Sequence, residues 1–233
     1  AMLAVNVGIG GTMNTVEQSS ELEGTAAIVT GSTGTLGRAI AMTLADAGAM
    51  VLINARTSAD AAASVVKEIE AKGGRAVAHL ADVTVPEQVE GMVEAAVGAF
   101  GRLDILVNNV GPSLKQPITD ISFEDWRKFV GNILDGAFLC IKSTVPHLAE
   151  HGQGSIINIG SSSAHAGIAN NSPSAAAKMG LAGLTGSLAV ELAPRGINVN
   201  CVAPGRIERP GALSAHYRDR PPPQGREGKP EEL

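Results

Sequence analysis

Short apolar runs alternate with longer amphipathic stretches along most of the chain. Runs rich in Val, Ile and Ala predict strands at residues 25–30, 50–54, 75–80, 104–108, 155–160 and 197–202. Most of these runs are continuous, which is typical of strands buried on both faces of a parallel sheet. The stretches between them predict helices near residues 36–48, 58–73, 86–100, 122–150 and 173–193. This order of elements predicts an α/β fold, a doubly wound parallel sheet with helices on both faces.

Two of the predicted helices carry further local signals. Thr84 and Glu87 have the spacing of a capping box, and Pro86 suits a first helical turn, so we expect a helix to begin there. In the stretch 122–150, apolar residues recur at spacings of three and four residues. This recurrence predicts one buried face, formed by Trp126, Val130, Ile133, Ala137 and Ile141.

Composition fits a folded domain in a reducing compartment. The chain has 233 residues, of which 44% are hydrophobic and 18% are charged, so a sizeable core is possible. A net charge of −5 argues against nucleic acid or an anionic membrane as a partner. The two cysteines are too few for a disulfide framework or a cysteine-rich zinc site. We therefore expect a cytoplasmic protein with no metal site and no membrane span.

A glycine-rich loop follows the first predicted strand. Residues 30–37 read TGSTGTLG, and Gly31, Gly34 and Gly37 allow a tight turn and a close approach of the backbone to a pyrophosphate. At the first strand-to-helix connection this loop predicts a dinucleotide site in a Rossmann-like sheet, although a plain glycine-rich turn is the alternative. We expect further cofactor contacts in the same loop from Ser32, Thr33 and Leu36.

The end of the second strand predicts which dinucleotide binds. An NAD site places Asp or Glu there, whereas residues 54–56 read Asn-Ala-Arg. Arg56 can pair with a 2′-phosphate, so Asn54 and Arg56 favour NADP(H), and an ordinary surface arginine is the alternative. Asp82 and Val83, after the third strand, are candidates for holding the adenine, although helix-start chemistry also explains the acid.

The fourth strand leads into the sequence NNVG at residues 108–111. Asn109 and Gly111 then fall at the carboxyl edge of the sheet, where ligands of this fold bind. We include both residues among the expected cofactor contacts, and a bare turn is the alternative interpretation.

Together these motifs resemble the short-chain dehydrogenase/reductase family in its single-domain form. The resemblance covers about residues 24–207 and includes Asn132, Ser161, Lys178 and the pair Pro204-Gly205. Among members of the family, the sequence is similar to 3-oxoacyl-carrier-protein reductases and to sugar or polyol dehydrogenases. The resemblance implies hydride transfer between NADP(H) and a small carbonyl or alcohol substrate, catalysed by a homodimer or homotetramer.

The resemblance also implies roles for individual residues. In the family a tyrosine exchanges a proton with the substrate oxygen, and a lysine four residues later lowers the tyrosine pKa and holds the nicotinamide ribose. A serine polarises the substrate oxygen, and an asparagine supports a water chain to the lysine. The serine corresponds to Ser161, the lysine to Lys178 and the asparagine to Asn132. Further cofactor contacts are implied for Pro204, Gly205 and Ile207.

The position of the family's tyrosine holds Ser174. It lies 13 residues after Ser161, which is the family's register, and the single tyrosine of the chain is Tyr217. Because a serine hydroxyl is a much weaker acid, and general acid catalysis contributes roughly 10²–10⁴-fold, we expect impaired turnover. Candidate replacement proton donors are His165, and Tyr217 together with His216.

We divide the chain into three parts. Residues 1–24 lack the basic start of a secretory signal and are interpreted as an extension or flexible lead-in. Residues 25–204 are the dinucleotide-binding Rossmann domain, and residues 205–233 are a substrate-lid loop with a truncated C-terminal tail. Since the family continues through another helix and strand, we expect the last strand of the sheet to be missing. The glycine spacing, which is that of longer epimerase-type members, and Arg209, where the family usually has Thr, are further departures.

Two classes of function remain. The first is an NADP(H)-dependent oxidoreductase, favoured by Asn132, Ser161 and Lys178, with activity reduced by Ser174. The second is an NADP-binding homologue without catalysis that acts as a binding or partner subunit, favoured by the missing tyrosine. A non-redox enzyme has no positive signal. We interpret the chain as the oxidoreductase.

Overall fold

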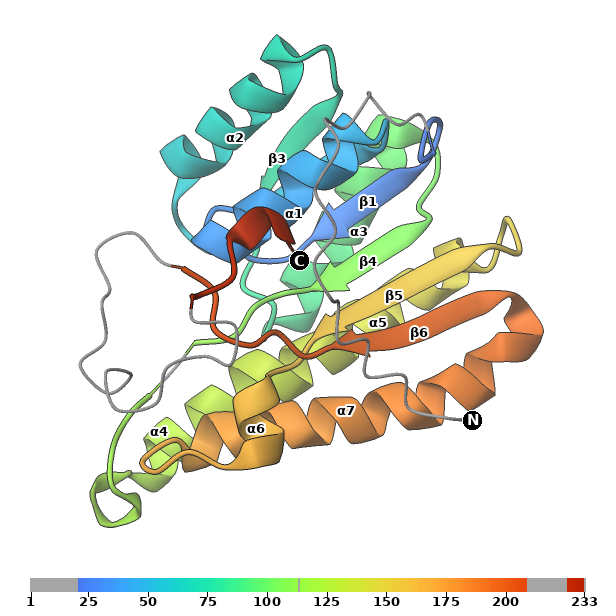
Figure 1. Ribbon diagram of the computed structural model, residues 1–233. Helices are drawn as coiled ribbons and strands as arrows, with labels where there is room; N and C mark the ends of the chain where they lie inside the picture. Colours follow the sequence, from blue (N-terminus) through green and yellow to red (C-terminus); the bar gives the residue numbers. More distant parts are fainter. Residues whose placement is uncertain (1–20, 113, 209–225, 233) are drawn as a thin grey trace.

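A parallel sheet of six strands lies between two layers of helices (Figure 1). The computed structural model describes residues 21–112, 114–208 and 226–232. The strand order is β3-β2-β1-β4-β5-β6, so the winding reverses between β1 and β4. This arrangement confirms the predicted doubly wound fold and places a topological switch point between those two strands. The strands are β1 (Ala26–Val29), β2 (Met50–Ala55), β3 (Ala76–Leu80), β4 (Ile105–Asn108), β5 (Gly154–Ile159) and β6 (Ile197–Val202).

Alternate residues of the central strands build two separate cores. Ile28, Leu52 and Leu106 face one side of the sheet, whereas their neighbours Val29 and Ile53 face the other. The residues on both sides are buried, which explains why the strands appear in the sequence as continuous apolar runs. Burial of apolar surface on both faces therefore holds both helix layers against the sheet.

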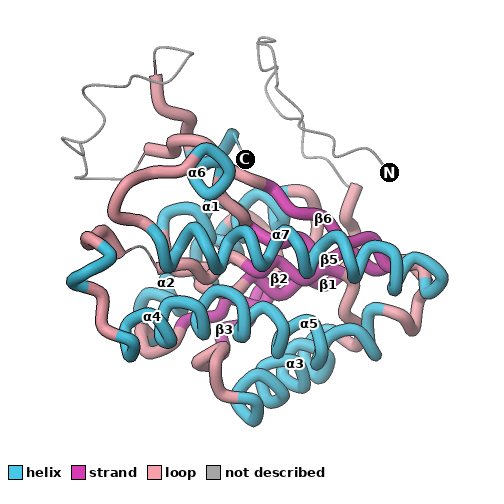
Figure 2. The backbone as a smooth tube through the Cα atoms, turned by 90° about the horizontal axis from the view of Figure 1, so that it is seen from below, coloured by secondary structure: helices cyan, strands magenta, loops and turns pink. Residues whose placement is uncertain are grey.

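Helices cover both faces of the sheet. One face carries α1 (Thr35–Asp46) and α2 (Ala59–Ala71). The other carries α3 (Pro86–Phe100), α4 (Phe123–Val130), α5 (Gly136–Leu148) and α7 (Ser172–Leu192), seen from below in Figure 2. The sequence did not predict the short helix α6 (Ser162–Ala166). Short 3₁₀ turns occur at η1 (Ile118–Asp120), η3 (Ala193–Arg195) and η5 (Pro230–Glu232).

The predicted capping box at the start of α3 is wrong. The helix begins at Pro86 as expected, but its N-cap is Val85, which makes no side-chain cap. The hydroxyl of Thr84 instead donates a hydrogen bond of 2.7 Å to Asp82 Oδ1. Because Asp82 lies two residues before Thr84, this local turn competes successfully with the cap.

The stretch 122–150 is helical, but it is not one α-helix. A π-helical turn, η2 (Gly131–Asp135), separates α4 from α5. Ile133 is buried in this turn, and Ala137 and Ile141 are buried on α5, whereas Trp126 and Val130 on α4 are half-buried. The predicted apolar face is therefore fully buried only from the π turn onward.

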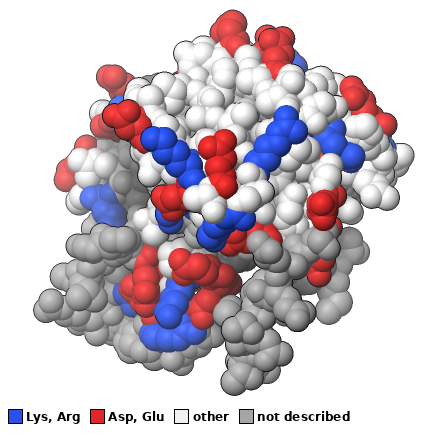
Figure 3. All heavy atoms as spheres, turned by 90° about the horizontal axis from the view of Figure 1, so that it is seen from above, with Lys and Arg blue, Asp and Glu red and all other residues white. Residues whose placement is uncertain are grey.

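The surface seen from above carries charges of both signs side by side (Figure 3). Lys72 pairs with Asp46 at 2.8 Å, and Arg38 pairs with Glu68 on the neighbouring helix. No helix in the described part of the chain is long and apolar enough to cross a bilayer.

Candidate active site

The candidate site lies where the carboxyl ends of β1, β2, β4 and β5 meet. The loops that leave these strands carry most of the residues that the sequence singled out. This is the edge of a doubly wound sheet at which ligands bind, next to the point where the winding reverses.

The glycine-rich loop after β1 is held in a shape that favours glycine at Gly31 and requires it at Gly37. Gly31 has a positive φ of 62°. A Cβ on Gly37 would lie 2.4 Å from the carbonyl oxygen of Gly31 and 2.5 Å from Asn109 Nδ2. The N-cap of α1 is Gly34, which provides no capping side chain, and no acidic residue lies in the first turn. The free N–H groups at this helix start fit a pyrophosphate.

Asn109 ties the loop to the end of β4. Its Nδ2 donates to the carbonyl oxygens of Thr30 at 2.9 Å and Gly31 at 3.2 Å. The backbone N–H of Asn109 also donates to the hydroxyl of Thr30 at 3.0 Å. The structure thus places Asn109 against the glycine loop, where it shapes the expected pyrophosphate site.

Asn54 braces the same loop from the end of β2. The side chain is 1% exposed, and its Oδ1 accepts a hydrogen bond of 3.0 Å from the N–H of Gly31. Its Nδ2 donates to the carbonyl of Ala81 at 3.1 Å, and its backbone N–H donates to Ser32 Oγ at 2.8 Å. Both ends of the amide are therefore engaged within the protein, and Asn54 positions the loop.

Arg56 is exposed beyond the end of β2 and lies close enough to Asp82 to affect its charge. Partial burial opposes ionisation of Asp82, but hydrogen bonds from the Thr84 N–H and hydroxyl, together with the Arg56 charge, lower its pKa. Val83 is buried, and a Cβ on Gly136 would lie 2.7 Å from Val83 Cγ2. The candidate adenine contacts are thus held against the start of α5.

Lys178 is a buried lysine on α7. It is 7% exposed, and its Nζ donates a hydrogen bond to the carbonyl oxygen of Ile159 at the end of β5. A Cβ on Gly111 would lie 2.9 Å from this Nζ, so the loop after β4 closes over the amine. Burial lowers the pKa of Lys178 to about 8, an effect that the nearby Cys201 partly offsets.

Asn132 lies in the π turn between α4 and α5. Its Nδ2 donates to the carbonyl oxygen of Lys128 at 2.7 Å. Asn132 also lines a small cavity with Thr30, Asn108 and Cys140. Asn108 Oδ1 is buried and has no hydrogen-bond partner in the described part of the chain. An unsatisfied acceptor beside a small cavity fits a bound water molecule.

The serine positions follow at the end of β5 and the start of α7. Ser161 is the N-cap residue of α6, and its Oγ lies 2.7 Å from Ser163 Oγ. Ser174 is half-buried in the first turn of α7, four residues before Lys178. Residues at this spacing share one face of a helix, so the structure brings Ser174 and Lys178 together.

The remaining candidates are placed less centrally. His165 is exposed on α6, whereas Arg209, His216 and Tyr217 lie outside the described residues. The Pro204 carbonyl accepts a hydrogen bond of 3.0 Å from the N–H of Ser162, which puts the Pro204-Gly205 turn beside α6. Ile207 forms a parallel bridge with Gly228.

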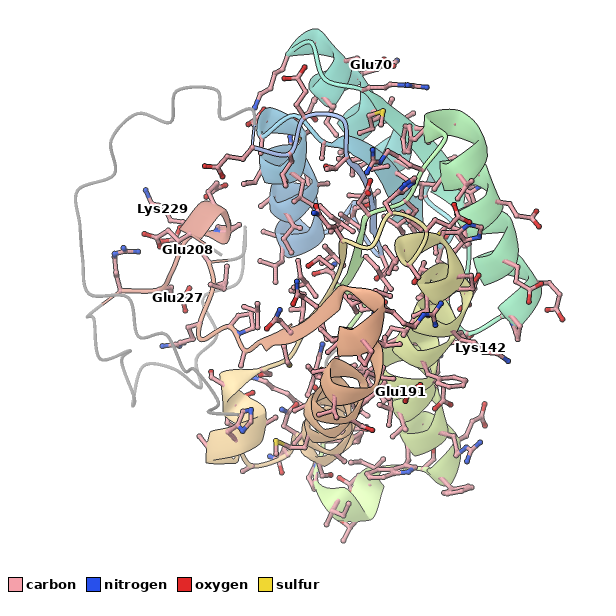
Figure 4. All side chains as sticks on the ribbon, turned by 90° about the vertical axis from the view of Figure 1, so that its right-hand side faces the viewer. Glu70, Lys142, Glu191, Glu208, Glu227 and Lys229 are labelled. Carbon is pink, nitrogen blue, oxygen red and sulfur yellow. The ribbon has the colours of Figure 1, made fainter. Side chains whose placement is uncertain are left out.

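The turn η5, near the end of the described residues, contacts α1. Arg206 pairs with Glu227 at 3.2 Å, and Arg226 pairs with Glu232 at 2.7 Å. Figure 4 shows Glu208, Glu227 and Lys229 gathered around η5, and this turn packs against α1. The expected substrate-lid region is thus described only at its two ends.

Sequence reasoning missed a chain of buried polar groups below the site. Asn108 Nδ2 donates to Asn158 Oδ1 at 2.9 Å, and Asn158 Nδ2 donates to Thr185 Oγ1 at 3.0 Å. The three residues are at most 7% exposed. The available signal was an asparagine within each of two apolar strands, since a buried polar group needs a partner.

Comparisons with known proteins agree with this geometry. A family model described as short chain dehydrogenase matches residues 25–219. The chain therefore belongs to the short-chain dehydrogenase family, a family of oxidoreductases that use a nicotinamide cofactor.

Individual relatives cover most of the chain. A 3-oxoacyl-[acyl-carrier-protein] reductase of Synechocystis sp. is 37% identical, over 89% of this chain and 85% of its own length. The (2S)-[(R)-hydroxy(phenyl)methyl]succinyl-CoA dehydrogenase subunit BbsD of Thauera aromatica is also 37% identical, with the same two coverages. The crystal structure of a dehydrogenase/reductase from Sinorhizobium meliloti 1021 is similar with a TM-score of 0.87 and 38% identity. That match covers 92% of this chain and 86% of the other.

The close contacts of Gly37 predict a large difference between two glycine-to-alanine substitutions. Gly37→Ala should lower the free energy of unfolding by about 1–3 kcal/mol, because neither the Gly31 carbonyl nor the Asn109 amide has room to move. It should also weaken NADPH binding. Gly98→Ala on α3 is the control, since a Cβ there meets open space and should stabilise the helix by about 0.5–1 kcal/mol. Urea unfolding and NADPH fluorescence titration measure both effects, and equal behaviour of the two variants would contradict the close packing.

Proposed function

We propose that this chain is an NADP(H)-dependent oxidoreductase that interconverts a ketone and a secondary alcohol. The observation that carries the proposal is the position of Lys178. Its buried amine lies under the loop after β4, at the sheet edge that also holds the glycine-rich loop and Ser161. When bound, the nicotinamide supplies or accepts the hydride.

Residues of the protein bind the cofactor, polarise the substrate and supply protons. The glycine loop and the start of α1 hold the pyrophosphate, and Lys178 holds the nicotinamide ribose. The hydroxyl of Ser161 donates a hydrogen bond to the substrate oxygen and polarises the carbonyl. Asn132 holds a water molecule in the small cavity beside the unsatisfied Asn108 Oδ1, and this water connects the site to a source of protons.

The preference for NADP(H) is supported by the end of β2. No carboxylate stands there to bind a ribose hydroxyl, because the buried Asn54 occupies the end of the strand. The exposed guanidinium of Arg56 follows, and the N-cap residue of α2, Ser58, uses no side-chain hydrogen bond for capping. An anionic 2′-phosphate suits this combination of a cation and a helix start.

The Arg56 proposal predicts a selective loss of affinity. Arg56→Ala should raise the Kd for NADPH about tenfold, the value of roughly one charge-assisted hydrogen bond, and should leave the Kd for NADH within about twofold. Arg127→Ala, an exposed arginine on α4, is the matched control. Fluorescence titration measures all four constants, and wild-type binding of NADPH and NADH with equal affinity would overturn the NADP(H) assignment.

The substrate is proposed as an acyl thioester with a ketone at the β position, that is, a 3-oxoacyl thioester. The support is the names of two relatives, the 3-oxoacyl-[acyl-carrier-protein] reductase and the (2S)-[(R)-hydroxy(phenyl)methyl]succinyl-CoA dehydrogenase subunit, since both names describe thioester-linked groups. A substrate panel should therefore contain 3-oxoacyl thioesters beside simple ketones and sugars.

Ser174 in place of tyrosine predicts slow turnover that can be repaired. Ser174→Tyr should raise reductase kcat at least about tenfold, the lower end of what a general acid contributes. Ser172→Tyr, in the same first helical turn, controls for the added ring. Kinetics across the substrate panel measure the gain. Binding of NADPH with no gain on any substrate would favour a non-catalytic binding or partner subunit instead.

We also propose that the protein forms a homodimer or homotetramer through the outer face of α7. Met179 and Val190 on this helix are 43% and 77% exposed, and Gly183 and Gly186 between them leave open space. Phe138 on the neighbouring α5 is 50% exposed. A row of small residues flanked by exposed apolar side chains suits close contact with a second helix.

This contact predicts a change of size in solution. Val190→Lys should shift the protein toward the monomer, because it places a charge in the apolar contact. Ala63→Lys, on the exposed side of α2, should leave the size unchanged. Light scattering after gel filtration measures the mass of each variant, and an unaltered Val190→Lys oligomer would exclude this face.

A further inference from the structure

Among the described residues of the site, Lys178 combines a buried side chain, a place at the carboxyl edge of the sheet and a proton that it can donate near neutral pH. His165 is exposed on α6, and the thiol of Cys140 is buried, with burial raising its pKa to about 12. Ser161 and Ser174 are hydroxyls, which are poor acids. We propose that Lys178 is the general acid of this chain and takes the role of the missing tyrosine. This inference rests on the proposed oxidoreductase function and assigns its proton donor.

The geometry of α7 supports the assignment. Ser174 and Lys178 are separated by four residues on the same helix, so the amine follows the Ser174 position on the same face. A serine reaches much less far than a phenol, so the Ser174 side chain leaves room for one water molecule between the lysine and the substrate oxygen. General acids act across one hydrogen bond or through one water molecule.

The surroundings of the amine keep its proton exchangeable. Nζ donates to the Ile159 carbonyl, an uncharged acceptor, and the loop at Gly111 covers it. The groups packed around it come from β5, the loop after β4, and β6. Of these, Cys201 on β6 is the titratable neighbour that influences Lys178 in the described part of the chain. Because no carboxylate among the described residues is paired with it, the ammonium is not locked in its charged form.

The proposed step balances in both directions. In reduction, a hydride adds to the carbonyl carbon, the C=O π bond breaks, and the ammonium of Lys178 passes one proton through water to the oxygen. The products are the alcohol, oxidised cofactor and neutral amine, and solvent then returns the proton to the amine. In oxidation the neutral amine accepts the proton from the alcohol. Reduction therefore requires protonated Lys178, and oxidation requires the neutral form.

The first test compares a titration with a rate profile. We expect NMR of ¹³Cε-labelled lysine in the protein without cofactor to give Lys178 a pKa near 8, identified by the resonance lost in Lys178→Met. The kcat/KM of wild-type reduction, which reports the groups of the free enzyme, should fall about tenfold for each pH unit above that same pKa, and the kcat/KM of oxidation should rise through it. The proposal would be overturned by a Lys178 resonance that titrates near pH 10.5. It would also be overturned by a rate of reduction that does not change between pH 7 and pH 10.

The second test replaces the amine from solution. Lys178→Ala should lose reductase kcat by roughly 10²-fold or more, and methylamine or ethylamine should restore it at least tenfold. The rate of the rescued reaction should depend on the pKa of the added amine. No such dependence is expected if Lys178 only binds the ribose. Lys142→Ala is the matched control, because Lys142 is an exposed lysine on α5 (Figure 4). A restored affinity for NADPH without a restored kcat would assign Lys178 to binding alone.

The two proposals fail in different ways. If wild type is inactive and Ser174→Tyr is active, the oxidoreductase function stands and Lys178 is not a competent acid. If both proteins bind NADPH and neither reduces any member of the panel, the oxidoreductase function itself is wrong. If wild type is active but its rate does not change with pH around the pKa of Lys178, only the assignment of the proton donor fails.

Discussion

The amide hydrogen bonds at the carboxyl ends of the central strands are the constraint on which the site depends. Asn54 from β2 and Asn109 from the end of β4 hold the Gly31 region from two sides, and neither strand is next to the other in the sheet. Each such bond contributes about 1 kcal/mol, but leaving a buried partner unpaired costs more. The glycine loop, the start of α1 and the end of β4 thus form one rigid unit, and the other parts of the site are placed relative to it.

Burial of Lys178 follows from this arrangement. The loop after β4 begins at the Asn109 tie and passes directly over the amine at Gly111. Below the site, the polar chain from Asn108 to Thr185 joins β4, β5 and α7, the helix that carries Lys178. A charged group is normally expensive to bury, so a fold that covers this lysine, which has no carboxylate partner among the described residues, lowers the pKa of its amine.

Much of the fold could be predicted from the sequence, because strands buried on both faces leave continuous runs of Val, Ile and Ala. The glycine loop could be predicted from its glycines, since Gly31 has a positive φ and a Cβ on Gly37 would lie 2.4 Å from the carbonyl oxygen of Gly31. Local signals failed where two hydrogen bonds competed, as when Asp82 took the Thr84 hydroxyl from the α3 cap. Burial of Lys178 could not be derived from α7 alone, because the covering groups come from β5 and from the loop at Gly111, distant in sequence. The role of Asn54 in holding the glycine loop could not be predicted either, because its hydrogen-bond partners lie in segments distant in sequence.

The π turn at Gly131–Asp135 also has a consequence for how the protein tolerates change. A π turn holds about one residue more than the α-helical turn it replaces, and each residue of an α-helix corresponds to roughly 100° of rotation. Before the π turn, α4 packs on α7, and after it, α5 packs on α3. Deleting a single residue here would straighten the helix and rotate α4 by about that angle, turning Trp126 away from its present neighbours. The segment therefore accepts substitution more readily than any change of length, because its length sets how α4, and with it the cavity lined by Asn132, is oriented relative to α7.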